Sequence, residues 1–272
     1  MTKNTMLNFI CFGSGSSGNC YCLYTETYGI IIDAGIGARI LKKRFNDYGV
    51  DLTKMMAILV THDHADHAKS VGALSADYCL PVYTTPEVFV GMRNNCCVRK
   101  NVQPGYGREI HYGEHFTIND MDIVCFHVPH DSTDNVGYFI TMEGITFCII
   151  TDAGSVTDEM KEYIGKAQYL VIESNYEYEK LMKGPYSQIL KERISSSIGH
   201  LSNEECGKTL AQYASPLLRH VWLAHLSEEN NHPELARKTV EQQLRQHGII
   251  PGIDFNLDIL KRRTPSEIYL LE

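Results

Sequence analysis

Residues 62–67 read HDHADH and place three histidines and two aspartates within six positions. Side chains two positions apart point to the same side of an extended chain, so His62 and His64 can face one point. Asp66 and His67 follow at the expected start of a helix, which turns them towards the same small volume. Imidazole and carboxylate ligands together suit zinc, iron or manganese better than calcium. The spacing therefore predicts two metal positions, with His62 and His64 on one ion and Asp66 and His67 on the other.

The competing interpretation is a solvated histidine-rich loop, or a helix start that favours acidic side chains. A single histidine would fit it, but this cluster follows the apolar run AILV (57–60), which favours a metal site. Further candidate ligands follow other apolar runs, and each of them alone could be a capping or structural residue: His130, Asp152 and His225. The carboxylate of Asp152 could bridge both ions. His127 competes with His130, although the alternation of DIVCFHV directs it into the fold.

The elements that must position these residues can be read from periodicity and turn residues. Strands are expected at 7–12, 21–25, 29–34, 56–61, 169–174 and 220–225, with paired strands within 109–128 and 137–153. Helices are expected at 36–49, 67–78, 156–165, 200–214 and 232–248. Ser202 and Glu205 form a capping box at the fourth helix, and Pro233 occupies the first position of the fifth.

These elements form two successive halves that each mix strands and helices, and metal-competent residues recur where apolar strands end. Strand ends are where layered α/β proteins usually place their chemistry. The pattern predicts an α/β fold that is a four-layer αββα sandwich, in which two mixed β-sheets pack face to face with helices outside. We expect residues 1–272 to form a single domain.

Composition narrows the function class. The 272 residues include 43% hydrophobic and 21% charged residues, as in an ordinary soluble globular protein. The net charge of −8 predicts no general attraction to nucleic acid, although LKKRF (41–45) and LKRR (260–263) are basic clusters that could equally be solvated faces. The nine cysteines lie mostly in apolar runs, which indicates reduced structural thiols and a cytoplasmic location. Neither a signal peptide nor a membrane span is expected.

Taken together, Asp33, THDHADH, His130, Asp152 and His225 resemble the metallo-β-lactamase fold superfamily over nearly the whole chain. The stretches GSGSSGNCYCL (13–23), IESNYE (172–177), GHLSNEE (199–205) and LAHLSEENN (223–231) resemble its YycJ/WalJ-like branch, which is related to nucleases that process nucleic-acid ends. The resemblance implies one metal on His62, His64 and His130, and another on Asp66, His67 and His225. It further implies that Asp152 bridges the metals and that Asp33 orients the site without binding a metal.

The resemblance also implies a function. It indicates a dinuclear metal-dependent hydrolase of the phosphodiesterase or nuclease type, similar to a DNA exonuclease, that uses a metal-bridging hydroxide. Its catalytic candidates are Asp66, His200 and Glu173, with His200 protonating the leaving oxygen while Glu173 holds it. On the residues alone, His200 could instead pack beside the cap Ser202, and Glu173 could pair with a lysine. Zinc ranks first as the metal, ahead of manganese and iron, and nucleic acid is the expected substrate, although the large clamp domain of related nucleases is absent from the sequence.

Other interpretations remain open. Ser16, Ser17 and Asn19 lie in the glycine-rich stretch GSGSSGN, which either makes a tight turn or presents donors to a phosphate. The main rival function is a hydrolase of small esters, thioesters or lactones that uses the same metal pair. Di-iron redox chemistry ranks lower, because His64 stands where oxidoreductase relatives usually have a carboxylate. A non-catalytic binding protein and a β-lactamase rank lower still.

Overall fold

The strands of this computed structural model, which describes residues 6–272, form two sheets of seven strands each. In spatial order, the first sheet contains β14 (Tyr269–Leu271), β1 (Leu7–Gly13), β2 (Cys20–Tyr24), β3 (Gly29–Ile32), β4 (Met55–Leu59), β5 (Val82–Thr84) and β6 (Gly107–Glu109). The second contains β13 (Asn256–Ile259), β12 (His220–Ala224), β11 (Tyr169–Glu173), β10 (Ile145–Ile150), β9 (Val136–Met142), β8 (Met121–His127) and β7 (His115–Ile118).

Each sheet is antiparallel in one part and parallel in the other. In the first sheet, β14 and β1 to β3 pair antiparallel, and β3 to β6 pair parallel. In the second, β7 to β10 pair antiparallel, and β10 to β13 pair parallel. The carboxyl ends of neighbouring parallel strands meet at one edge of a sheet, so the residues that follow β3 and β4, and those that follow β10, β11 and β12, are brought together.

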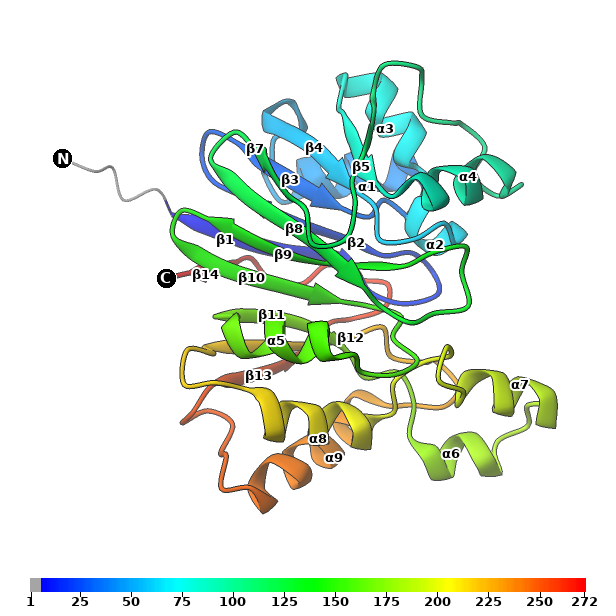
Figure 1. Cartoon of the computed structure of the whole chain (residues 1–272), viewed down its shortest axis with the longest axis vertical. Coiled ribbons are helices and arrows are strands. Elements are labelled where there is room, and N and C mark those ends of the chain that lie inside the picture. The colour runs from blue at the N-terminus through cyan, green and yellow to red at the C-terminus, as the bar shows by residue number, and fades with distance from the viewer. Residues whose placement is uncertain (1–5) are drawn as a thin grey trace.

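Helices cover the outer face of each sheet (Figure 1). The helices are α1 (Ala38–Asp47), α2 (Ala65–Ala68), α3 (Val71–Tyr78), α4 (Pro86–Asn94), α5 (Asp158–Lys166), α6 (Tyr178–Lys183), α7 (Gln188–Ile194), α8 (Asn203–Tyr213) and α9 (Pro233–Gln246), with a 3-10 turn at Leu52–Lys54. Apolar residues of α1, α3 and α4 pack on the first sheet, and those of α5, α8 and α9 pack on the second.

A third apolar cluster fills the space between the sheets. The ring of Phe9 in β1 lies 4.5 Å from that of Trp222 in β12 and 5.1 Å from that of Phe147 in β10, measured between centroids. These large side chains are fully buried. The two sheets therefore pack face to face with helices outside, and the predicted four-layer αββα architecture is confirmed.

Several local predictions differ in detail from the structure. The expected helix at 67–78 is two helices, α2 and α3, separated at residues 69–70. The predicted capping box of α8 is confirmed, since Glu205 N donates to Ser202 Oγ at 3.1 Å and Ser202 N donates to Glu205 Oε2 at 3.4 Å. Helices α4, α6 and α7 and strands β5, β13 and β14 were not predicted. The side chain of His127 is 48% exposed, which corrects its expected place in the interior, because His127 ends β8 where the strand leaves the core.

Two expectations concern cysteines and membranes. None of the nine cysteines forms a disulfide; six are buried, and Cys79, Cys96 and Cys97 are exposed. Throughout residues 6–272, no helix combines the length and apolar character that crossing a membrane requires. The cytoplasmic location remains a prediction.

Candidate metal centre

Three candidate site residues share an unusual backbone conformation just after a strand. Asp33 follows β3, Asp152 follows β10, and His225 follows β12, and their φ angles are 60°, 54° and 53°. This left-handed region disfavours residues with a Cβ atom, and such strain of about 1–3 kcal/mol per residue tends to cluster at functional sites. All three side chains belong to one cluster, because Asp33 pairs with His67 and Asp152 lies close to both His67 and His225.

The first group of candidate ligands comes from the end of β4 and the loop after β8. One ring nitrogen from each of His62, His64 and His130 lies within 4.8 Å of the others. His130 Nε2 is 3.4 Å from His64 Nδ1, and the His62 and His64 ring centroids are 4.8 Å apart. Three converging imidazoles at this spacing can bind one transition-metal ion.

The second group consists of Asp66 and His67 of α2 with His225. Their ligand atoms also lie within 4.8 Å of one another, and Asp66 Oδ2 is 3.6 Å from His225 Nε2. Asp152 stands between the groups, because its Oδ2 is 3.1 Å from His67 Nε2 and its Oδ1 is 3.8 Å from His130 Nε2. The structure thus brings together all seven residues for which the sequence predicts a ligand role.

Buried partners fix the orientation of these imidazoles. His67 Nδ1 lies 2.7 Å from Asp33 Oδ2, and Asp33 also accepts hydrogen bonds from the backbone N and Oγ1 of Thr61 at 2.8 and 2.9 Å. His130 Nδ1 donates to the carbonyl of Gly199 at 2.9 Å. A metal-binding histidine is usually held in this way through its other nitrogen, which leaves Nε2 directed at the ion.

Glu173 and His200 form a buried pair beside the ligands. Glu173 Oε1 lies 2.8 Å from His200 Nδ1 and 2.9 Å from His225 Nδ1, and its Oε2 accepts from the backbone N of Ala153 at 2.9 Å and of Leu201 at 3.0 Å. Glu173 is fully buried and pairs with histidines, not with a lysine. The His200 side chain is 22% exposed, so it joins the buried carboxylate to the surface.

The charges at the centre are strongly coupled. Burial and the neighbouring His67 hold the pKa of His62 well below its ordinary value. Burial by itself lowers the pKa of His67, but the carboxylates of Asp152 and Asp33 outweigh it and raise that pKa to about 10. Burial raises the pKa of Asp152, whereas His225 and His67 outweigh burial and hold it well below its ordinary range. Protonated imidazoles therefore compensate the negative charge of the buried carboxylates. Bound cations would replace that positive charge, and the protons would be released.

The buried polar atoms at the centre fit a metal pair. Within the described part of the chain, His62 Nε2, Asp152 Oδ2 and His225 Nε2 are buried and have no hydrogen-bond partner. Leaving such a group unpaired costs about 1–3 kcal/mol, and all three atoms face the two ligand groups. Divalent cations bound there would give each atom a partner.

The glycine-rich stretch has the geometry of a tight turn. Asn19 Oδ1 accepts from Gly15 N at 2.7 Å, and Asn19 N donates to the carbonyl of Asp66 at 2.7 Å. Asn19 thereby fixes the turn and holds the start of α2, whereas Ser16 and Ser17 are exposed at its tip. A phosphate-binding role for these serines remains a prediction.

Sequence reasoning missed two residues that hold His225. Ser14 Oγ accepts from the backbone N of His225 at 2.8 Å, and Asn175 Nδ2 donates to its carbonyl at 2.7 Å. Both lie inside the stretches GSGSSGN and IESNYE, which already carried the resemblance. A residue that supports another through its backbone leaves no pattern of metal-ligand types in the sequence. The only signal for Ser14 and Asn175 was therefore their place in the two stretches GSGSSGN and IESNYE.

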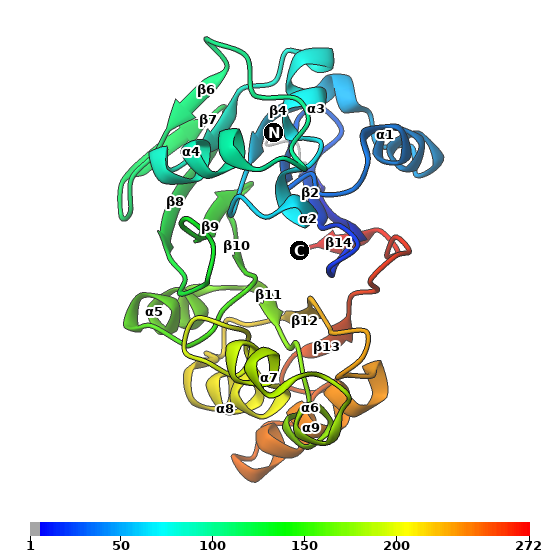
Figure 2. The same ribbon diagram turned by 90° about the vertical axis from the view of Figure 1, so that its right-hand side faces the viewer.

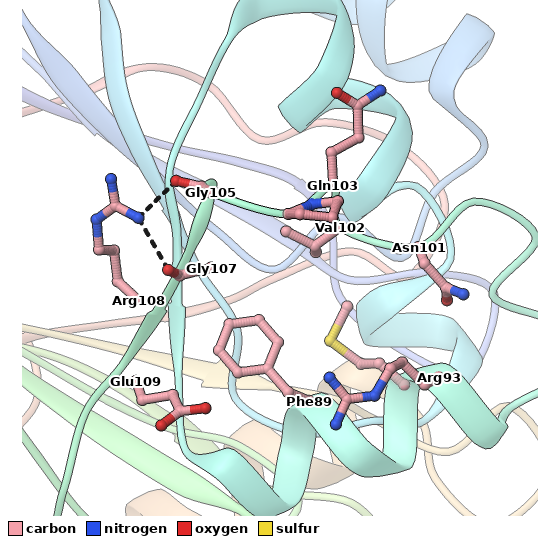
Figure 3. A pocket seen from close by; sticks show the side chains of 11 residues that line it. Phe89, Arg93, Asn101, Val102, Gln103, Gly105, Gly107, Arg108 and Glu109 are labelled. Carbon is pink, nitrogen blue, oxygen red and sulfur yellow. Dashed lines mark hydrogen bonds between the residues drawn. The ribbon is translucent and has the colours of Figure 1, made fainter.

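A larger cavity lies elsewhere and contains none of these residues. It has a volume of about 750 Å³ and is lined by α4, β6 and the segment that joins them (Figure 3). Arg108 Nη1 donates to the carbonyls of Gly105 and Gly107 at 2.7 and 2.9 Å, at one side of the cavity. Phe89 and Arg93 line the other side. Glu109 is its one acidic residue, so it offers no ligand set for a metal.

Comparisons with known proteins agree with this geometry. A sequence model of the beta-lactamase superfamily domain matches residues 28–226. The chain is 32% identical over 262 residues to exodeoxyribonuclease YycJ of Bacillus anthracis, covering 96% of this chain and 98% of that protein. It is 33% identical over 244 residues to exodeoxyribonuclease WalJ of Streptococcus pneumoniae, covering 90% of each. Among solved structures, the metallo-beta-lactamase fold protein YhfI from Bacillus subtilis aligns with a TM-score of 0.72 at 17% identity, covering 98% of this chain and 100% of that chain.

Proposed function

This chain belongs to the metallo-β-lactamase superfamily, in its YycJ/WalJ-like branch, and we propose that it hydrolyses phosphodiester bonds at the ends of DNA strands. Family membership makes it a metal-dependent hydrolase, with a His/Asp cluster able to hold metal ions. The choice of DNA as substrate rests on two relatives that are about one-third identical over most of the chain and are named exodeoxyribonucleases.

The observation that carries the proposal is the arrangement of two ligand groups around Asp152, with the Glu173–His200 pair at their side. Hydrolysis of an anionic ester needs charge neutralisation, an activated water and a proton for the leaving oxygen. The ligand groups meet the first two needs when they hold metals, and His200 meets the third. A carbonyl ester depends less on a proton donor for its leaving oxygen, so the Glu173–His200 pair favours a phosphodiester substrate.

We propose that His62, His64 and His130 hold one ion, that Asp66, His67 and His225 hold the other, and that Asp152 contacts both. When bound, a pair of divalent ions supplies a hydroxide near neutral pH and neutralises the phosphoryl oxygens. The histidine-rich ligand set suits zinc first, with manganese and iron as alternatives.

The chain's own residues organise the remaining chemistry. Asp33 fixes the tautomer of His67, and Glu173 holds both His225 and His200 through one carboxylate oxygen. Burial lowers the pKa of His200, but Glu173 outweighs burial and raises it above its ordinary value. The imidazole therefore keeps a proton near neutral pH, which Nε2 can deliver to the leaving oxygen at the exposed side of the pair.

We further propose that residues 1–272 act as one hydrolase domain. The first sheet contributes Asp33 and the residues after β4, whereas the second contributes Asp152, Glu173 and His225. Each of the two groups proposed to hold an ion draws on both sheets, because His130 joins His62 and His64, and His225 joins Asp66 and His67. The two halves must therefore fold together to make the site.

The direct test is an activity panel on the metal-loaded protein, with and without chelator. The substrates are end-labelled DNA, end-labelled RNA, a bis-aryl phosphodiester and a thioester. We expect metal-dependent loss of nucleotides from DNA ends. Cleavage of the thioester with no cleavage of any phosphodiester would instead favour the rival hydrolase of small esters, thioesters or lactones.

A further inference from the structure

Helices α6 and α7 and their connection, residues 178–194, form a projection that we name the α6–α7 arm (Figures 1 and 2). Helix α7 buries none of its residues, and Ile189 is 81% exposed. Leu190 and Ile194 are one helical turn apart and share a face. Because α7 buries none of its residues in a core, its apolar residues indicate a role other than core packing.

That face forms one wall of a cavity of about 220 Å³, beside the metal centre. Leu190 and Ile194 line it together with Tyr186 from the α6–α7 connection. The lining also includes His200 and two polar residues from other loops, Asn175 and Ser227. Pockets for drug-sized ligands measure about 300–1,000 Å³, so this cavity suits one base with its sugar and excludes a stacked base pair.

A guanidinium group also lines the cavity. Arg193, in the last turn of α7, pairs through Nε with the carboxylate of Asp131, which follows the candidate ligand His130. The Arg193 side chain is 61% exposed, so its remaining N–H groups face solvent. Guanidinium is well suited to bind phosphate oxygens, and this one pairs with the residue next to the candidate ligand His130.

We propose that this cavity binds the terminal nucleotide of a DNA strand on the leaving-oxygen side of the scissile phosphate. Tyr186 packs against the base, Leu190 and Ile194 contact the base and sugar, and Arg193 binds phosphate oxygens. Because His200 lines the cavity, a nucleotide seated there presents its ester oxygen to the proposed proton donor. The inference rests on the proposed function and deepens it: room for one nucleotide restricts cleavage to strand ends.

The test measures how far cleavage depends on the terminal base. Oligonucleotides that carry an ordinary or an abasic nucleotide at one terminus are cleaved by the metal-loaded protein, and the ratio of their kcat/KM values is determined for each terminus. At the terminus that the protein attacks, we expect the wild-type protein to prefer the ordinary end by about 5- to 150-fold, the range that stacking of one base on an aromatic side chain gives. In Tyr186→Ala that ratio should fall close to one, and in Tyr186→Phe it should return to the wild-type value.

Tyr178→Ala is the matched control, because Tyr178 lies on the same arm, is 54% exposed and does not line the cavity. It should keep the wild-type ratio. A wild-type ratio in Tyr186→Ala would overturn the assignment, since general damage to the site changes both rates but not their quotient. Circular dichroism and metal content establish that each variant is folded and loaded.

A binding measurement separates this inference from the proposed function. Thymidine 5′-monophosphate is titrated into the wild-type protein and into Tyr186→Ala by calorimetry. Wild-type binding that weakens about 5-fold or more in the variant supports the cavity even if the wild-type protein cleaves no DNA. Absence of wild-type binding, or equal affinity in both proteins, removes the inference even if the protein is a nuclease.

Discussion

The residue type and position of His200 do not by themselves indicate its proposed role as a proton donor. In the sequence it could have been a packing residue next to the cap Ser202. In the structure it lies 2.8 Å from the fully buried carboxylate of Glu173, and its side chain is 22% exposed. A buried carboxylate that holds a solvent-facing imidazole is the arrangement a general acid needs.

Replacing His200 by alanine should lower kcat by about 10²–10⁴-fold, the usual contribution of a positioned proton donor. Metal content should stay at the wild-type level, because His200 is in neither of the two groups proposed to hold the ions, although it lies within 4.8 Å of the ligand atoms of Asp152, Glu173 and His225. Steady-state kinetics on DNA and elemental analysis of the same preparation check both statements. Wild-type turnover by the variant would remove the proton-donor role, whereas loss of metal would make His200 a ligand.

Asp33 should act through His67 and not through substrate. Asp33→Asn removes the carboxylate charge 2.7 Å from His67 Nδ1, and loss of such a partner typically weakens metal affinity about 10- to 100-fold. Competition with a chromophoric chelator measures the affinity. Asp122→Asn is the matched control, since Asp122 pairs with His115 on the surface at 3.0 Å. Equal metal affinity in both variants would show that Asp33 does not orient the site.

At this scale the sequence predicted the residues that carry a distinctive chemistry. Histidines and aspartates after apolar runs could be recognised, and the structure brings all seven together. Ser14 and Asn175 could not be recognised, because they hold His225 through its backbone N and carbonyl. A hydrogen bond to a main chain leaves no residue-type signal at the position it supports.

At the scale of elements, the site depends on close approach of two segments. Gly35 follows the site residue Asp33, and a Cβ atom at Gly35 would lie 1.6 Å from the carbonyl oxygen of Asp66. The start of α2 can therefore pack against the β3 end only if residue 35 has no side chain. This contact sets the position of both Asp66 and His67.

Gly35→Ala should displace α2, lower the free energy of unfolding by about 1–3 kcal/mol or more and weaken metal binding. Urea denaturation and chelator competition measure the two effects. Gly37→Ala is the control, because nothing lies within 4 Å of a Cβ atom at that position. Equal stability and metal affinity for the two variants would contradict the close-packing account.

Periodicity predicted most of the longer elements that pack into the core, and it missed short elements and helix α4, which packs on the first sheet. Strand β10, which precedes Asp152, strand β11, which ends at Glu173, and the capped helix α8 were found because they bury apolar faces or carry a capping box. Helix α7 buries no residue and has only seven, so the pair Leu190 and Ile194 is too short a pattern for periodicity to detect. Strands β5 and β14 have three residues each, too few for alternation to stand out.

At the scale of the whole molecule, the candidate metal centre lies at the strand ends of two sheets that pack face to face over a largely apolar interface. Phe9, Phe147 and Trp222 hold the sheets together between their faces, and the ligand groups close the space at the strand ends. Mixed β/α halves in the sequence were enough to predict this layering. The distances between halves were not predictable, since they depend on contacts such as the one that permits a 3.1 Å approach of Asp152 and His67.

Removing the metals should therefore weaken the whole fold as well as abolish hydrolysis. A ligand present at 100 times its Kd stabilises the native state by about 2.7 kcal/mol per site, so the Tm should fall by on the order of 10 °C for two sites. Scanning calorimetry before chelation, after chelation and after metal is restored measures the change. An unchanged Tm together with metal-free hydrolysis of DNA would be incompatible with a structural and catalytic metal pair.

We propose that seven side chains from both halves of the chain hold two ions. The most direct test is a crystal structure of the zinc-loaded protein with anomalous diffraction recorded at the zinc edge. It should give two peaks about 3.5–4 Å apart, one within His62, His64 and His130, the other within Asp66, His67 and His225, with Asp152 reaching both. A single peak, or peaks away from Asp152, would contradict the proposed two-metal site.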